Sequence, residues 1–295
     1  MRIAFFGSGS PLSTTVLSGL SDRHEIVAVV IPDKPVGRRD PLRRLFGMLP
    51  KNPLTKIATE RGAKTFGFSR NRLHSLRSHL ARVRPDVIAV ASFPSFIPPD
   101  VLQTAKHGGL NLHQSLLPAG RGPDPIFWSY YNDDTHAGST IHWLDDAFDH
   151  GDILSQEAVA IARGRSCYDL YFELARLGSR QFNQAIDAVE AQHPPRQPQD
   201  ESRATYHKSP FQVPWRVSFD VWNAERTWHF LSGVGAMIGA LCRDPSGHLL
   251  PMGPASGYAI ENHHRVPGTY ETTSSGLRLF CPDGVVEVKR SPAAQ

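Results

Sequence analysis

Two polar side chains end an apolar stretch near the middle of the chain. Asn111 and His113 lie two residues apart in the run Gly109–His113, which we expect to be a strand. Side chains two apart on a strand share a face, so both should project the same way. Because polar groups are poor core material and open α/β sheets bind ligands at the carboxyl ends of their strands, the pair indicates a ligand site. A hydrogen-bonded core histidine is the alternative.

An acidic segment supplies carboxylates for this pair. Four aspartates lie within residues 145–152, around Gly151, and follow a further expected strand over residues 139–144. Their spacing lacks the pattern of an EF-hand and its terminal glutamate, which argues against a calcium loop. If this strand pairs with Gly109–His113, one of these carboxylates approaches His113.

A partial dinucleotide fingerprint occurs near the N-terminus. Gly7 and Gly9 follow an expected strand and precede an expected helix, but Leu12 stands where the third glycine belongs. We interpret this segment as a tight turn from strand to helix. A nicotinamide-dependent oxidoreductase remains a distant alternative.

The elements that carry these residues alternate between strand and helix patterns, which is typical of crossover units in a mostly parallel sheet. We predict an α/β fold with a Rossmann-like sheet. The most regular helical pattern starts at Cys167, because its apolar side chains fall broadly on one face. The expected strands are residues 2–6, 25–31, 86–91, 109–113 and 139–144, and the expected helices are residues 13–20 and 167–191.

A proline-rich stretch, residues 193–199, ends the last of these helices. Short strand-like runs follow at residues 268–270, 276–280 and 285–289, with a Pro-Asp-Gly turn before the last. We therefore predict three parts: a catalytic domain over residues 1–191, a linker over 192–204, and a smaller β-rich domain, an OB-like barrel, over 205–295.

Positive charge is concentrated in one segment. Residues 34–84 hold 14 Lys or Arg and two acidic residues, a local charge of +12 in a chain of net charge +4. Such a segment is a candidate site for a polyanion, and solvated surface is the alternative. Residues 201–295 are nearly neutral, with nine basic and eight acidic residues.

The composition narrows the class of protein. The 295 residues are 40% hydrophobic and 20% charged, which suits a folded chain of two domains. The three cysteines form no CxxC pair, which argues against a disulfide scaffold or a cysteine zinc site, and we expect no metal. We expect no signal peptide, no membrane anchor, a cytoplasmic location and a monomer.

Three blocks of sequence together resemble the signature of the folate-dependent formyltransferases. They are Asn111-x-His113, the run Ser115–Pro118, and Phe148-Asp149-x-Gly151-Asp152-Ile153-Leu154. The segments 32–38 and 267–270 are similar to parts of the methionyl-tRNA formyltransferase group within that family. The resemblance implies formyl transfer from 10-formyltetrahydrofolate to an amino group.

The resemblance also implies roles for individual residues. Asn111 would orient and polarise the formyl oxygen, and His113 would donate a proton to the oxyanion and to the leaving nitrogen. Asp149 would hold the imidazole and favour its charged form. The expected folate-binding residues are Ser115, Leu116, Leu117 and Pro118, with Phe96 and Ile97 as further lining.

The acceptor amine is the open part of this interpretation. Methionyl-initiator-tRNA is the leading candidate, with its phosphates contacted by Arg38, Arg39, Arg43 and Arg44. A small amine, such as an amino sugar, an amino acid or a carrier-bound aminoacyl group, is the main alternative. Two departures from the methionyl-tRNA formyltransferase group leave the acceptor open. Residues 121–128 resemble the formylation domains of nonribosomal peptide synthetases, and the C-terminal part lacks the basic charge that a tRNA-binding domain needs.

Two further hypotheses keep the fold. The first is hydrolysis of 10-formyltetrahydrofolate, with water in place of the amine. The second is a non-catalytic RNA-binding module, for which Asn111, His113 and Asp149 together would have no chemical purpose.

Overall fold

The computed structural model describes residues 1–33, 52–210, 215–238, 242–250 and 252–290. The chain divides into two compact units, which are described separately. The first unit comprises residues 1–121, 138–158 and 172–205, and the second comprises residues 122–137, 159–171 and 206–295.

A seven-stranded sheet organises the first part of the chain, in the order β3-β2-β1-β4-β5-β6-β7. The pairs of neighbouring strands from β3 to β5 are parallel, and β5 pairs with β6 antiparallel. The predicted mostly parallel α/β sheet is therefore confirmed. The strands are β1 (Arg2–Gly7), β2 (Glu25–Pro32), β3 (Lys64–Phe68), β4 (Val87–Ala91), β5 (Gly109–His113), β6 (His136–Trp143) and β7 (Ile153–Ala160).

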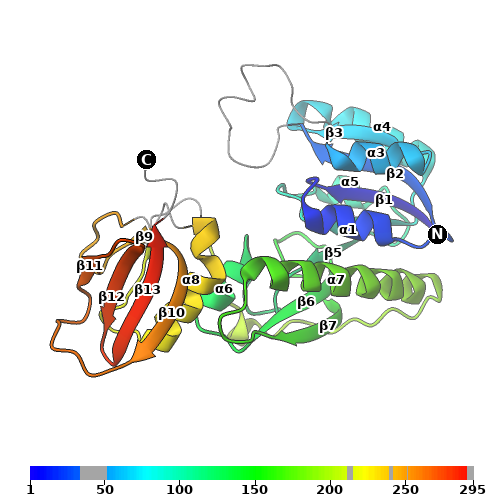
Figure 1. Ribbon diagram of the computed structural model, residues 1–295. Helices are drawn as coiled ribbons and strands as arrows, with labels where there is room; N and C mark the ends of the chain where they lie inside the picture. The colour runs from blue at the N-terminus through cyan, green and yellow to red at the C-terminus, as the bar shows by residue number, and fades with distance from the viewer. Residues whose placement is uncertain (34–51, 211–214, 239–241, 251, 291–295) are drawn as a thin grey trace, which may run out of the picture. The chain divides into compact units, whose positions relative to one another are not determined.

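The crossover connections between these strands are helical (Figure 1). Helix α1 begins after Ser10, whose hydroxyl accepts a hydrogen bond from the Ser13 amide and caps the helix after the turn from β1. The helices are α1 (Pro11–Gly19), α3 (Pro53–Glu60), α4 (Leu73–Val83), α5 (Pro99–Leu102) and α7 (Cys167–Glu190), with a 3₁₀ turn at Arg70–Arg72.

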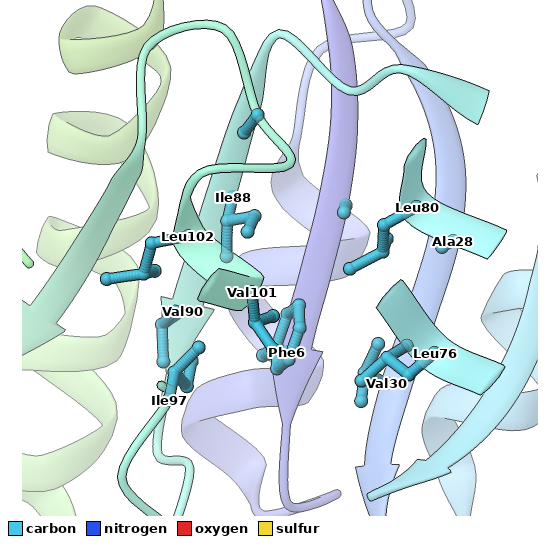
Figure 2. Packing of buried hydrophobic residues seen from close by; sticks show 12 residues of the cluster. Phe6, Ala28, Val30, Leu76, Leu80, Ile88, Val90, Ile97, Val101 and Leu102 are labelled. Atoms are coloured by element: carbon cyan, nitrogen blue, oxygen red, sulfur yellow. The ribbon is translucent and has the colours of Figure 1, made fainter. Parts of the chain in front are cut away.

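One buried hydrophobic cluster lies between a face of the parallel strands and helices α4 and α5 (Figure 2). Alternate residues of three neighbouring strands point to this face, as the period of two in a strand requires. They meet Leu76 and Leu80 of α4 and Val101 and Leu102 of α5. The strand residues on this face are Ala4 and Phe6 of β1, Ala28 and Val30 of β2, and Ile88 and Val90 of β4.

The second unit contains a four-stranded antiparallel sheet in the order β10-β13-β12-β11, which confirms the β-rich C-terminal part. Helix α8 (Ala224–Ile238) packs on β10 and was not predicted. The strands are β10 (Met252–Ile260), β11 (Tyr270–Thr272), β12 (Gly276–Cys281) and β13 (Gly284–Arg290). The unit also holds α6 (Pro125–Tyr131) and a short parallel pair, β8 (Trp215–Arg216) and β9 (Cys242–Arg243).

The expected linker, residues 192–204, is part of the first unit. Gln197 forms an isolated antiparallel bridge with Ile153 through both backbone groups. A 3₁₀ turn at Glu201–Arg203 follows, and the indole of Trp143 donates to the carbonyl of Pro195. Among the helices of the described residues, none is long and apolar enough to cross a bilayer.

Candidate active site

Strands β5 and β6 set the register of the predicted polar pair. Asn111 lies directly opposite His142, and His113 lies opposite Thr140. Residues directly opposite on an antiparallel pair have side chains on the same face and in contact range. Asn111, His113 and His142 therefore form one cluster, and His142, which is 1% exposed, was missed by the sequence reasoning. Thr140 and His142 alternate along the expected strand, but this pattern indicates a site only once the register between β5 and β6 is known.

The acidic loop after β6 brings Asp149 into this cluster. One carboxylate oxygen, Oδ1, lies 3.5 Å from Asn111 Nδ2, 3.5 Å from His113 Nδ1 and 3.7 Å from His142 Nε2. Asp149 is 9% exposed, so the contacts lie largely out of water, where charge interactions are strong. The structure thus brings together Asn111, His113 and Asp149, as the sequence predicts.

His113 is held from both sides of its ring. Its Nε2 lies 2.8 Å from the backbone oxygen of Gly120, and its Nδ1 faces the Asp149 carboxylate. A carbonyl oxygen only accepts, so Nε2 must carry a hydrogen. The Asp149 carboxylate faces the other ring nitrogen, so the imidazole is oriented by a partner on each side.

Asn111 is oriented by His142. Nδ1 of His142 lies 2.8 Å from the backbone oxygen of Trp143 and must therefore donate. In the neutral ring, Nε2 is then an acceptor, and it lies 3.0 Å from Asn111 Nδ2. The second amide hydrogen of Asn111 faces Asp149 over the longer distance of 3.5 Å.

The predicted folate-binding run follows β5 directly and is fixed by neighbouring side chains. Ser115 Oγ donates to the carbonyl of Ala119 at 2.8 Å, and Thr140 Oγ1 donates to the carbonyl of Ser115 at 2.7 Å. Gln156 donates to the carbonyl of Leu117 at 2.8 Å. The run Ser115–Pro118 leads to Gly120, the partner of His113, so it borders the cluster. Its contact with folate stays a prediction.

The two other predicted lining residues have different surroundings. Ile97 belongs to the buried core described above and is 5% exposed. Phe96 is 36% exposed and packs edge-on against Phe148, which is 58% exposed and adjacent to Asp149. Of the two, only Phe96 offers a substantial surface to a ligand beside the cluster.

His150 follows Asp149, and its ring contacts the carboxylates of Asp145 and Glu201. Its Nδ1 lies 2.6 Å from Asp145 Oδ2, and its Nε2 lies 3.5 Å from Glu201 Oε1. The hydrogen bond to Asp145 raises the pKa of His150, although the side chain is half-exposed and screened by solvent.

We expect His150→Ala to destabilise the protein more at acidic than at alkaline pH. A pKa raised in the folded state contributes stability below the unfolded value, near ~6.5, and this contribution is lost as the pH rises through the folded pKa. Thermal unfolding at pH 5.5 and pH 9 measures this, with His193→Ala, an exposed histidine beyond α7, as control. Equal losses in melting temperature at both values would contradict the pairing.

The basic segment is described only in part. Arg38, Arg39, Arg43 and Arg44 lie outside the described residues. Three arginines of its remainder pair with aspartates: Arg61 with Asp22, Arg72 with Asp33 and Arg77 with Asp100. Within the described ranges, no group of three or more His, Cys, Asp or Glu side chains is arranged to hold a metal ion.

Fold and cluster together define a formyl transferase domain. Residues 1–186 match the family model described as formyl transferase. The chain belongs to the formyl transferase family.

Curated relatives are methionyl-tRNA formyltransferases. The chain is 33% identical over 201 residues to that of Pelotomaculum thermopropionicum, covering 68% of this chain and 62% of the relative's length. It is 28% identical over 295 residues to that of Acetivibrio thermocellus, covering 98% of this chain and 91% of the relative. The chain thus spans less than two thirds of the length of the Pelotomaculum thermopropionicum protein and most of the length of the Acetivibrio thermocellus protein.

A solved structure has the same fold over nearly its whole length. The N-formyltransferase from Helicobacter canadensis, solved with folinic acid and dTDP-3-aminofucose, superposes with a TM-score of 0.69 at 15% identity. The match covers 98% of each chain.

Proposed function

We propose that the protein transfers the formyl group of 10-formyltetrahydrofolate to an acceptor amine. One observation carries this proposal. Asn111 Nδ2 and His113 Nδ1, at the carboxyl end of β5, each lie 3.5 Å from the same carboxylate oxygen of Asp149. Membership of the formyl transferase family supports the same reaction.

The reaction places distinct demands on these side chains. The acceptor nitrogen attacks the formyl carbon, whose oxygen becomes an oxyanion. The bond from that carbon to N10 then breaks, its electron pair goes to N10, N10 takes a proton and the amine loses one. Asn111 donates an N–H to the formyl oxygen, replacing its 3.5 Å contact with Asp149. The catalytic hydrogen bond thus tightens only when substrate is bound, as is common in unliganded sites.

His113 supplies the proton. The hydrogen on its Nε2 faces the carbonyl of Gly120 at 2.8 Å, and a bound formyl oxygen competes with that carbonyl for it. Asp149 faces the opposite side of the ring at 3.5 Å and holds the imidazole in this orientation. Donors aimed at a developing oxyanion contribute most to catalysis when they are preorganised and shielded from water.

Gly151→Ala should lower kcat of this transfer on the order of 10²-fold. A Cβ at Gly151 would lie 2.0 Å from the backbone oxygen of Trp143, where real contacts stay above 3.0 Å. The loop that carries Asp149 must therefore move, and a shift of about 1 Å in a catalytic group costs roughly this factor. Steady-state kinetics measures the change. Gly257→Ala, where a Cβ meets open space, is the control, and an unchanged kcat for Gly151→Ala would refute the close packing.

Methionyl-initiator-tRNA is the acceptor that we propose. The names of the curated relatives and the +12 charge of residues 34–84 support it. A small amine, including a nucleotide-linked amino sugar, is the second candidate. The near-neutral charge of residues 201–295 and the amino-sugar ligand of the Helicobacter canadensis structure favour this candidate.

One assay separates these outcomes. The protein is mixed with 10-formyltetrahydrofolate and either methionyl-initiator-tRNA or a panel of small amines, and tetrahydrofolate release is followed by absorbance. Transfer to the tRNA that weakens steeply with salt supports the tRNA, because phosphate contacts release counterions. Transfer only to a small amine supports the second candidate. Formate release without an acceptor indicates a hydrolase, and absence of any turnover would refute the proposed reaction.

A further inference from the structure

A hydrogen-bond network around a buried arginine joins the cluster to the segment expected to be a linker. Its centre is Arg121, which is 0% exposed. The guanidinium binds both carboxylate oxygens of Glu201, at 2.6 and 3.0 Å, and the side-chain oxygen of Gln199, at 2.7 and 3.1 Å. A buried cation requires such partners, so Arg121 is fixed in place.

Gln199 connects this network to the loop of Asp149. Its Oε1 accepts the hydrogen bonds from Arg121, and its Nε2 donates to the carbonyl of Asp149 at 3.0 Å and to that of Gly151 at 2.8 Å. The guanidinium only donates and the two carbonyls only accept, so the amide can take only this orientation. If the amide group of Gln199 rotates by 180°, donors face donors and acceptors face acceptors, so all four hydrogen bonds are lost.

The backbone at Asp149 has a conformation that requires stabilising contacts from its surroundings. Asp149 has a φ of 55°, in the left-handed region that non-glycine residues adopt only when their surroundings enforce it. Two hydrogen bonds to the carbonyls of Asp149 and Gly151 bracket this conformation. They fix the direction in which the Asp149 side chain leaves the loop, toward His113.

The same network fixes the other partner of His113. Gly120, whose carbonyl faces His113 Nε2, immediately precedes Arg121. The amide of Gly120 donates to Thr205 Oγ1 at 2.8 Å, and the amide of Arg121 donates to the carbonyl of Thr205 at 2.9 Å. Both groups that hold the imidazole are therefore anchored to residues 199–205.

From this geometry we infer that Gln199 is a positioning residue for formyl transfer: held by Arg121, it fixes the loop of Asp149 so that the carboxylate faces His113. The inference rests on the proposed function, because its effect is read through the transfer rate. Gln199 touches no reacting atom, so it acts on kcat through Asp149 and leaves the binding of folate and amine nearly unchanged.

The test compares two substitutions at Gln199 with a matched control. Gln199→Leu removes all four contacts, and Gln199→Glu keeps an acceptor for Arg121 while it loses both donors. We expect each to lower kcat about 10- to 100-fold with KM changed less than about threefold, as for a misplaced catalytic group. Gln197→Leu should leave kcat unchanged, because the exposed Gln197 pairs through its backbone.

A double-substitution cycle distinguishes positioning from general loss of structure. If Gln199 acts through Asp149, Gln199→Glu should have little further effect on the residual rate of Asp149→Asn, because contacting residues are not additive. Equal effects in both backgrounds, or a normal kcat for Gln199→Glu, would overturn the inference while wild-type transfer still stands. Absence of transfer by the wild-type protein would instead refute the proposed function. Gln199→Glu carries the test if Gln199→Leu fails to fold.

Discussion

Asp149→Asn should lower kcat on the order of 10³- to 10⁴-fold without preventing folding. The carboxylate faces His113 Nδ1, and it also contacts Asn111 and His142 through the same oxygen. An amide of the same shape carries no charge to stabilise the imidazolium. Where a carboxylate holds a catalytic histidine in serine proteases, the same substitution costs about 10⁴-fold.

The measurement is single-turnover transfer at high enzyme concentration, which detects such low rates. Asp146→Asn, in the same loop, is the control, because Asp146 lies outside the contacts that hold His113. Circular dichroism confirms that the variant is folded. A loss of less than tenfold for Asp149→Asn would show that His113 keeps its proton without this carboxylate, and would contradict the proposed role.

The second large effect is expected for His113→Ala, a loss in kcat of at least about 10²- to 10³-fold. The substitution removes the donor to the oxyanion and to the leaving nitrogen, and loss of one such donor elsewhere costs about this factor. It also leaves the carbonyl of Gly120 and the carboxylate of Asp149 without their shared partner. KM for the folate should change much less than kcat, because the imidazole acts on the transition state.

His74→Ala, at an exposed histidine of α4, is the matched control for this variant. Steady-state rates with 10-formyltetrahydrofolate and the acceptor that the transfer assay selects give the comparison. A rise in KM with normal kcat would assign His113 to substrate binding instead of proton transfer.

Sequence patterns were sufficient to predict features that lie within a single helix, strand or short motif. Strand β5 was predicted with the bounds that it has, and α7 differs by one residue, because each has a clear apolar period. Asn111, His113 and Asp149 were found because they lie in short motifs. Their convergence is now a structural observation, and their catalytic roles stay predictions.

Features that depend on pairing between distant segments could not be read in this way. His142 became visible only through its register with Asn111 across β5 and β6. Gln199 lies in a polar, proline-rich stretch that is typical of a linker, and its contacts reach back 78 residues to Arg121. Helix α8 contains Gly233 and Gly235, which weaken helical propensity, and it is stabilised by packing on β10.

The network around Arg121 affects the order in which parts of the protein fold during synthesis. A ribosome delivers the chain from its N-terminus, and domains fold as their residues emerge. Glu201, the counter-ion of Arg121, emerges 80 residues after it, and Thr205 follows. Until then the guanidinium of Arg121 lacks the carboxylate that pairs with it, so we expect it to become buried only after residues 199–205 have left the exit tunnel. We therefore expect the cluster of Asn111, His113 and Asp149 to be one of the last parts of the first unit to become rigid during synthesis.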